Sequence, residues 1–215
     1  MIIIGMEGKP GSGKTTLAKT LAKNPDIKHI EVDAIVEKLG LVGLRNIVLK
    51  YANTLVKRAR SDDKIYKRDL NSQNDNIHNK IPTPIILKAA KNVFFKIVSN
   101  SIKKELKECE KSGTKIAIVD YALLNVSNIW NDFDYRVCVV KPEAERRKAL
   151  KHRDNANEND IEFVSLFSNF DIVKYGIGDV ICIQNDGSIE DLKLKGKNLI
   201  ETIVRKSEKT TEKDR

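Results

Sequence analysis

The sequence predicts an α/β protein in which a five-stranded parallel sheet is covered by helices on both faces. Short, almost wholly apolar segments alternate along the chain with longer segments that have the spacing of amphipathic helices. Strands that are apolar on both faces are typical of a parallel sheet buried between helices. The predicted strands are Ile2–Ile4, His29–Asp33, Lys115–Asp120, Tyr135–Val140 and Asp179–Ile183.

The segments between these strands predict helices. Gly40 and Gly113 each follow a helical pattern and are expected to end it, while Pro142 suits the first turn of the helix that begins there. The longest helix has a possible break near Ser99–Ser101. The predicted helices are Thr15–Lys23, Ala34–Leu39, Leu44–Ala59, Ile85–Lys111, the segment "PEAERRKALKHRD" from Pro142, and Ile189–Val204.

A chain of 215 residues is long enough for one domain with an embedded lid. We expect a single domain over residues 1–206, with an insert over about 41–112, a lid over about 142–175 and a flexible tail over 207–215. Within the insert, the polar and asparagine-rich stretch Ser61–Pro84 predicts a loop or a mobile segment.

The composition limits the class of protein. The formal net charge is 39 − 30 = +9, which favours phosphorylated small molecules or nucleic acid as partners, although scattered lysines without a role would give the same number. The three cysteines are far apart, which argues against a disulfide framework and a zinc site and fits a reducing compartment. We find no secretory signal and no apolar run of about 18 residues, so we expect a cytoplasmic protein that does not span a membrane.

The first predicted strand is followed by a glycine-rich loop. Gly8, Gly13, Lys14 and Thr15 match the motif G-x-x-x-x-G-K-[ST], and a helix opens on its last residues, as this phosphate-binding loop requires. The loop backbone presents N–H groups to phosphate oxygens, the lysine reaches the β- and γ-phosphates, and the threonine hydroxyl binds Mg²⁺. We therefore expect ATP·Mg²⁺ as the ligand. The predicted contacts are Gly8, Gly11, Ser12, Gly13, Lys14, Thr15 and Thr16.

Two carboxylates are expected beyond the carboxyl ends of strands, where ligands bind in open parallel sheets. These are Asp33 and Asp120. A carboxylate at this edge can lie near Mg²⁺ or accept the proton of a substrate hydroxyl. The alternative for each is a helix cap or a solvated turn.

The helix "ERRKALKHRD" is strongly basic. A transferring phosphoryl group needs cations around its developing charge, and arginine provides them with a fixed fork of donors. The alternative is a solvated basic face. The cations are Arg146, Arg147, Lys148, Lys151 and Arg153.

Three classes of function compete at this point. A switch GTPase is excluded because the chain has neither D-x-x-G nor N-K-x-D. An ATPase that binds nucleic acid is favoured by the charge, but aromatic residues make up only 6% of the chain and do not alternate with basic ones. A small-molecule kinase accounts for the length, the basic helix and the insert together.

The chain resembles the dephospho-CoA kinases, P-loop enzymes that phosphorylate the ribose 3′-hydroxyl of dephospho-coenzyme A. The similar segments are "IEVDAIVEKL", "YKRDL", "IKKELKECEKSGTKIAIVDYALL", "ERRKALKHRD" and "KYGIGDVICIQNDGSIEDL". The resemblance implies that Asp33 is the general base, that Arg147 and Arg153 act on the phosphoryl group, and that Asn185 and Gly187 lie against adenine. We also expect Lys14 to act in catalysis. Thr15 and Asp120 are the expected Mg²⁺ ligands.

The sequence departs from this family's pattern mainly in the half expected to bind the acceptor. Glu31 replaces an aspartate, Ser99-Asn100 replaces a His-Pro pair, and Ala149 stands where a lid arginine is expected. The expected activity is therefore transfer of the γ-phosphate of ATP to a small-molecule hydroxyl, with dephospho-CoA as the first choice. A nucleoside or nucleotide is the alternative acceptor, and a nucleic-acid-binding ATPase is the second alternative. The sequence predicts no oligomeric state.

Overall fold

A computed structural model of the chain describes residues 1–47, 84–124, 127–154 and 180–213. Five parallel strands form one sheet in the order β2-β3-β1-β4-β5. The strands are β1 (Ile2–Glu7), β2 (Ile27–Glu31), β3 (Ile116–Asp120), β4 (Tyr135–Val140) and β5 (Val180–Gln184). The predicted parallel five-stranded sheet is therefore confirmed.

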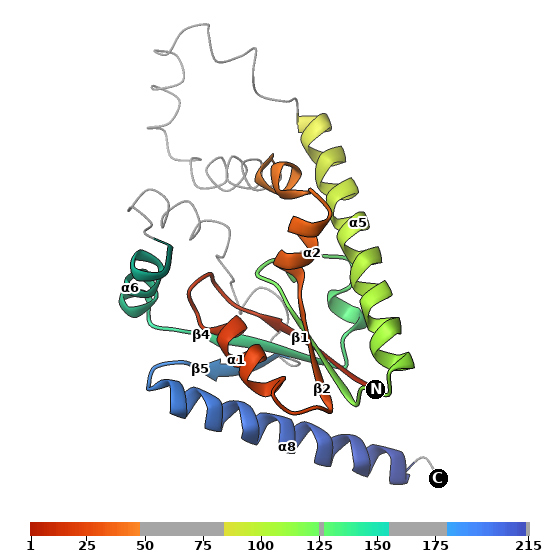
Figure 1. Cartoon of the computed structure of the whole chain (residues 1–215), viewed down its shortest axis with the longest axis vertical. Helices are drawn as coiled ribbons and strands as arrows, with labels where there is room; N and C mark the ends of the chain where they lie inside the picture. Colours follow the sequence, from red (N-terminus) through yellow and green to blue (C-terminus); the bar gives the residue numbers. More distant parts are fainter. Residues whose placement is uncertain (48–83, 125–126, 155–179, 214–215) are drawn as a thin grey trace, which may run out of the picture.

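Helices cover both faces of this sheet (Figure 1). On one face, α1 (Lys14–Leu21) and α8 (Ile189–Lys213) pack against the side chains that alternate strand residues direct to that side, such as Ile4, Met6 and Ile118. On the other face, α2 (Val32–Lys38) and α5 (Pro84–Lys111) enclose a second core with Phe94, Tyr121 and Trp130. All five residues of β3 are buried, as expected of a central strand.

The second strand ends earlier than its sequence suggests. β2 stops at Glu31, and Asp33 lies in the first turn of α2 rather than at the end of a strand. Glu31 pairs with Asp120, the last residue of β3, so no partner strand remains for residues beyond it. A carboxylate in the first turn is also favoured by the positive end of the helix dipole.

The other predicted boundaries hold to within a few residues, with three differences. α5 runs without a break through Ser99, whose side chain is buried. α8 continues to Lys213, beyond the predicted end at Val204. A helix begins at residue 42, and the rest of the predicted Leu44–Ala59 helix lies outside the described residues. The remaining elements are the short helix η2 (Trp130–Asp132) and α6 (Glu143–Asp154).

The predicted division into an insert, a lid and a tail stays a prediction, because half of the insert and most of the lid lie outside the described residues. Among the residues that are described, no helix combines the length and apolar character needed to cross a membrane. Cys109, Cys138 and Cys182 are all free thiols.

Candidate active site

The loop between β1 and α1 adopts the tight conformation that its glycines permit. Gly11 and Gly13 have φ angles of +83° and +95°, in the left-handed region that other residues rarely adopt. Gly13 is the N-cap of α1, so the helix begins at Lys14. Its first N–H groups have no partner within the helix and lie beyond the carboxyl end of β1. This arrangement of backbone donors and helix dipole is an anion-binding site.

Lys14 and Asp120 meet beneath this loop. The Lys14 Nζ lies 4.0 Å from Asp120 Oδ1, and the two side chains are only 9% and 2% exposed. Lys14 is therefore buried, which the loop motif alone did not indicate. Among the described residues, neither carboxylate oxygen of Asp120 has a hydrogen-bond partner. A buried carboxylate without donors needs a cation or ordered water.

His29 completes this cluster from β2. Its Nε2 lies 3.4 Å from Asp120 Oδ2, and it was not predicted from the sequence. The parallel pairing of β2 with β3 places both residues on the face covered by α1. Ser12 adds a further buried hydroxyl, to which no residue in the described part of the chain is hydrogen-bonded. Thr15 is half-buried and Thr16 is exposed on the first turn of α1.

Asp33 lies on the neighbouring helix α2, with a side chain that is 51% exposed. Its Oδ1 accepts a hydrogen bond of 3.0 Å from Nη1 of Arg45. Tyr121, directly after Asp120, is buried, and the burial together with the charge of Asp33 raises the pKa of its phenol. Arg45 and Tyr121 were not predicted as site residues, although the position of Tyr121 after a strand-end carboxylate was a usable signal.

The two arginines at the start of α6 have different surroundings. Arg146 is completely buried and binds both carboxylate oxygens of Glu143, at 2.9 and 2.6 Å. Its third contact is from Nη1 to the carbonyl oxygen of Pro10 in the loop, at 2.9 Å. Arg147 is 34% exposed and also contacts Glu143, at 3.1 Å. The Arg146 guanidinium is the main reason why the pKa of Glu143 is below its usual range.

The turn after β5 reaches the loop from the other side. Asn185 is 7% exposed and donates from Nδ2 to the carbonyl oxygen of Ser12, at 2.7 Å. Gly187 lies next to the side chain of Asp191, which accepts hydrogen bonds from Ser188. The predicted site residues that the structure brings to one edge of the sheet are those of the loop from Gly8 to Thr16, together with Asp120 and Asn185.

Other predicted features lie outside the described part of the chain. The segment "YKRDL" falls there, as does the predicted loop Ser61–Pro84 up to residue 83. The side chain of Arg153 is also not described, although its backbone belongs to α6. No cluster of three His, Cys, Asp or Glu side chains that could hold a metal occurs among the described residues. A metal bound at Asp120 would therefore need phosphate, hydroxyl or water oxygens as its other ligands.

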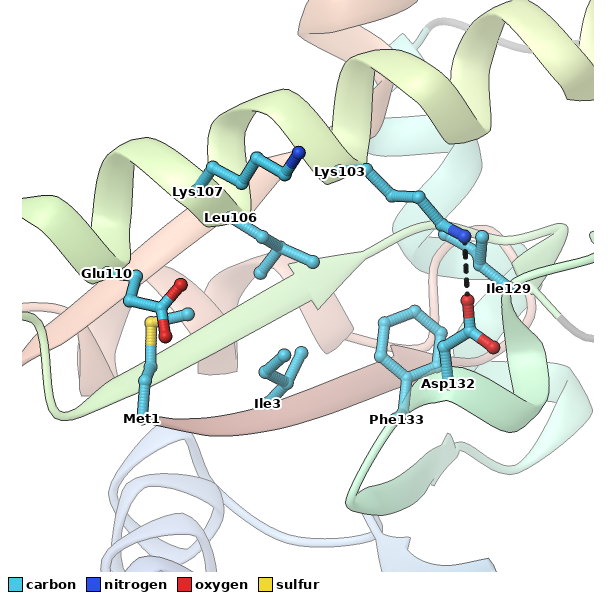
Figure 2. Close-up of a pocket in the computed structure, with 9 residues that line it drawn as sticks. All are labelled: Met1, Ile3, Lys103, Leu106, Lys107, Glu110, Ile129, Asp132 and Phe133. Atoms are coloured by element: carbon cyan, nitrogen blue, oxygen red, sulfur yellow. Dashed lines mark ion pairs between the residues drawn. The ribbon is translucent and has the colours of Figure 1, made fainter.

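A separate cavity of about 290 Å³ lies at the opposite end of β1 (Figure 2). Its floor includes Ile3, Leu106 and Phe133, and the ion pair between Lys103 and Asp132 crosses its rim. Because the phosphate-binding loop follows the carboxyl end of β1, this cavity is not part of the same site.

The fold and the loop define the class: a P-loop protein of the kinase type. The chain superposes on TT1252 from Thermus thermophilus with a TM-score of 0.60 at 19% identity, covering 94% of this chain and 97% of that one. It also superposes on the shikimate kinase from Acinetobacter baumannii with a TM-score of 0.55 at 12% identity, covering 96% and 94%. These similarities concern the fold.

Sequence similarity gives a narrower result. The chain is 28% identical over 209 residues to a dephospho-CoA kinase of Corynebacterium glutamicum, covering 94% of this chain and 100% of that protein. It is 25% identical over 210 residues to a dephospho-CoA kinase of Corynebacterium efficiens, covering 95% and 98%. No family model matches. The predicted resemblance to dephospho-CoA kinases is confirmed along nearly the whole chain.

Proposed function

We propose that this protein is an ATP-dependent kinase that transfers the γ-phosphate to the 3′-hydroxyl of dephospho-coenzyme A. The observation that carries the proposal is the end-to-end similarity to proteins named dephospho-CoA kinase, in a chain that has kept the complete phosphate-binding motif. Since ATP and coenzyme A precursors are metabolites of the cell interior, this activity implies a cytoplasmic enzyme.

The residues of the site have distinct roles in this proposal. Backbone donors from Gly8 to Thr16 and the Lys14 ammonium bind the triphosphate. Asp33 accepts the proton of the acceptor hydroxyl, and the ion pair with Arg45 leaves its Oδ2 available, since no described residue donates to that oxygen. Arg147 and Arg153 neutralise charge on the transferring phosphoryl group. Asn185 and Gly187 border the space for adenine.

The oxygen-rich pocket beside Lys14 suits Mg²⁺, which prefers oxygen ligands and keeps several waters. The buried carboxylate oxygens of Asp120, which accept no hydrogen bond from the described residues, support this assignment, and we assign Asp120 and the Thr15 hydroxyl to the ion. When bound, Mg²⁺ supplies charge neutralisation at the β- and γ-phosphates.

The test is a transfer assay with purified protein, ATP and Mg²⁺, in which product is identified by mass spectrometry. Dephospho-CoA is compared with a panel of nucleosides and nucleotides at equal concentration. We expect coenzyme A as the main product. Faster phosphorylation of a nucleoside or nucleotide would replace the proposed acceptor, and hydrolysis of ATP without transfer to any of them would remove the kinase proposal.

A further inference from the structure

The phosphate-binding loop is held from two sides by buried side chains that do not belong to it. On one side, Arg146 of α6 donates from Nη1 to the carbonyl oxygen of Pro10, at 2.9 Å. On the other side, Asn185 donates from Nδ2 to the carbonyl oxygen of Ser12, at 2.7 Å. Arg146 is fully buried and Asn185 nearly so, which makes both contacts stronger than the same contacts in water.

The two contacts fix the direction of two peptide groups. In a planar trans peptide, the carbonyl and the following N–H point in opposite directions. When the carbonyl groups of Pro10 and Ser12 are held toward Arg146 and Asn185, the N–H groups of Gly11 and Gly13 must point away from those side chains. In a loop of this kind, that is the direction of the bound phosphates.

Packing supports the same arrangement. A Cβ atom at Gly13 would collide with Asn185 Nδ2, and one at Gly11 would lie 3.0 Å from Leu150 Cγ and 3.2 Å from Arg146 Cγ. A side chain at Gly13 would therefore displace its support and one at Gly11 would crowd its support, and the positive φ angles of both positions favour glycine independently.

Arg146 is not free to follow a phosphoryl group. Glu143 binds its Nε and Nη2 and compensates its buried charge, while Nη1 is used by Pro10. A buried guanidinium that left these partners would lose charge compensation, which is strongly unfavourable. The arginine therefore acts as a fixed support, unlike the partly exposed Arg147 next to it.

We propose that Arg146 and Asn185 are positioning residues that orient the Pro10–Gly11 and Ser12–Gly13 peptides, so that the loop is preformed for a triphosphate. The proposal rests on the proposed function only in taking ATP as the ligand of the loop. A preformed site binds more tightly because less ordering remains to be done on binding.

The test measures ATP·Mg²⁺ affinity by calorimetry in the absence of any acceptor. Asn185→Asp has the same shape but directs a carboxylate oxygen at the Ser12 carbonyl, and Arg146→Met removes the donors to Pro10. Each is expected to raise the Kd for ATP by about tenfold or more, since each deletes a buried hydrogen bond and leaves a carbonyl without a partner. Arg146→Lys, which keeps one donor, is expected to lose less.

Two variants on the exposed side of α8 serve as matched controls. Asn198→Asp and Arg205→Met make the same chemical changes away from the loop and are expected to leave the Kd within about twofold. In the transfer assay, the loop variants are expected to raise the KM for ATP while the KM for dephospho-CoA changes little. If Arg146 and Asn185 served only folding, their replacement would lower the unfolding temperature without raising the KM for ATP relative to the KM for dephospho-CoA.

Unchanged ATP affinity in folded Asn185→Asp and Arg146→Lys would overturn the proposal, as would a defect confined to the KM for dephospho-CoA. If Arg146→Met does not fold, the other two variants decide. Because binding of ATP is measured without an acceptor, the inference is tested even if the unaltered protein phosphorylates a different acceptor or none.

Discussion

Asp33 and Asp120 carry the same side chain but have different surroundings, and these suggest different roles. Asp120 is 2% exposed, closes β3 and faces Lys14 and His29. Asp33 is 51% exposed in the first turn of α2, where Arg45 is the partner of one of its oxygens and no other described residue engages the second. The buried carboxylate of Asp120 is suited to holding a cation in the site. The accessible carboxylate of Asp33 is suited to contacting an acceptor that binds and is released.

Replacing Asp33 therefore tests the acceptor side. We expect Asp33→Asn to lower kcat by roughly 10²–10⁴-fold, the usual cost of losing a general base, while the KM for ATP stays close to normal. Asp132→Asn is the matched control, since Asp132 has similar exposure and also forms an ion pair, with Lys103, far from the loop. A kcat equal to that of the unaltered protein would remove Asp33 from the mechanism.

Replacing Lys14 tests the triphosphate side. We expect Lys14→Ala to reduce phosphoryl transfer by on the order of 10²-fold or more, because a preorganised cation at the phosphates is lost. Circular dichroism is expected to be unchanged, while Lys104→Ala on the exposed side of α5 keeps full activity. Normal turnover by Lys14→Ala would contradict the phosphate-binding assignment of the loop.

At the scale of elements, the start of α6 joins the loop through Glu143 and Arg146. Because the pKa of Glu143 is lowered in the folded protein, the folded state binds a proton there more weakly than the unfolded chain. This carboxylate therefore stabilises the fold above its ordinary pKa of 4.5, and the contribution disappears as the pH falls through the lowered pKa.

Glu143→Gln measures this effect. We expect the variant to unfold at a lower temperature than the unaltered protein at neutral pH, and the difference to vanish in acid, where Glu143 is protonated in both states. Glu145→Gln, an exposed neighbour on the same helix, is the control and is expected to show little difference at either pH. A difference in unfolding temperature between Glu143→Gln and the unaltered protein that grows in acid would contradict this explanation.

Adjacent strands also place two thiols side by side. Cys138 on β4 pairs with Cys182 on β5, but Cys138 is buried and Cys182 is exposed. Burial raises the pKa of Cys138 to about 12, so it stays protonated and unreactive. With iodoacetamide near pH ~8, we expect peptide mass spectrometry to find Cys182 modified first. Rapid modification that persists in Cys182→Ser would contradict this order.

At the scale of the whole molecule, the net charge of +9 favours nucleic acid as an alternative partner of the protein. Many of the described lysines are paired with nearby carboxylates, as Lys115 is with Asp26 and Lys195 with Asp186. We expect gel-shift titration at physiological salt to give only the non-specific range of about 10⁻⁴–10⁻⁶ M for DNA and RNA. Sub-micromolar binding would favour the nucleic-acid alternative over the small-molecule kinase.

Local patterns were enough to predict the sheet and the loop. Buried strands such as Ile116–Asp120 are apolar on both faces, and the strand–glycine–helix order around Lys14 is a property of neighbouring residues in the chain. Such features need no long-range contact to be recognised. The resemblance to dephospho-CoA kinases was likewise visible in short segments of sequence.

Where a strand ends, and which side chains meet across the sheet, depended on the tertiary structure. Asp33 belongs to a helix because β3 offers no partner beyond Asp120, and His29 reaches Asp120 only through strand pairing. The sequence by itself therefore determined the fold class, the phosphate-binding loop and the similarity to kinases. Only the tertiary structure decided that Arg146 and Asn185 hold the loop, because hydrogen bonds between residues more than 130 positions apart leave no periodic pattern in the chain.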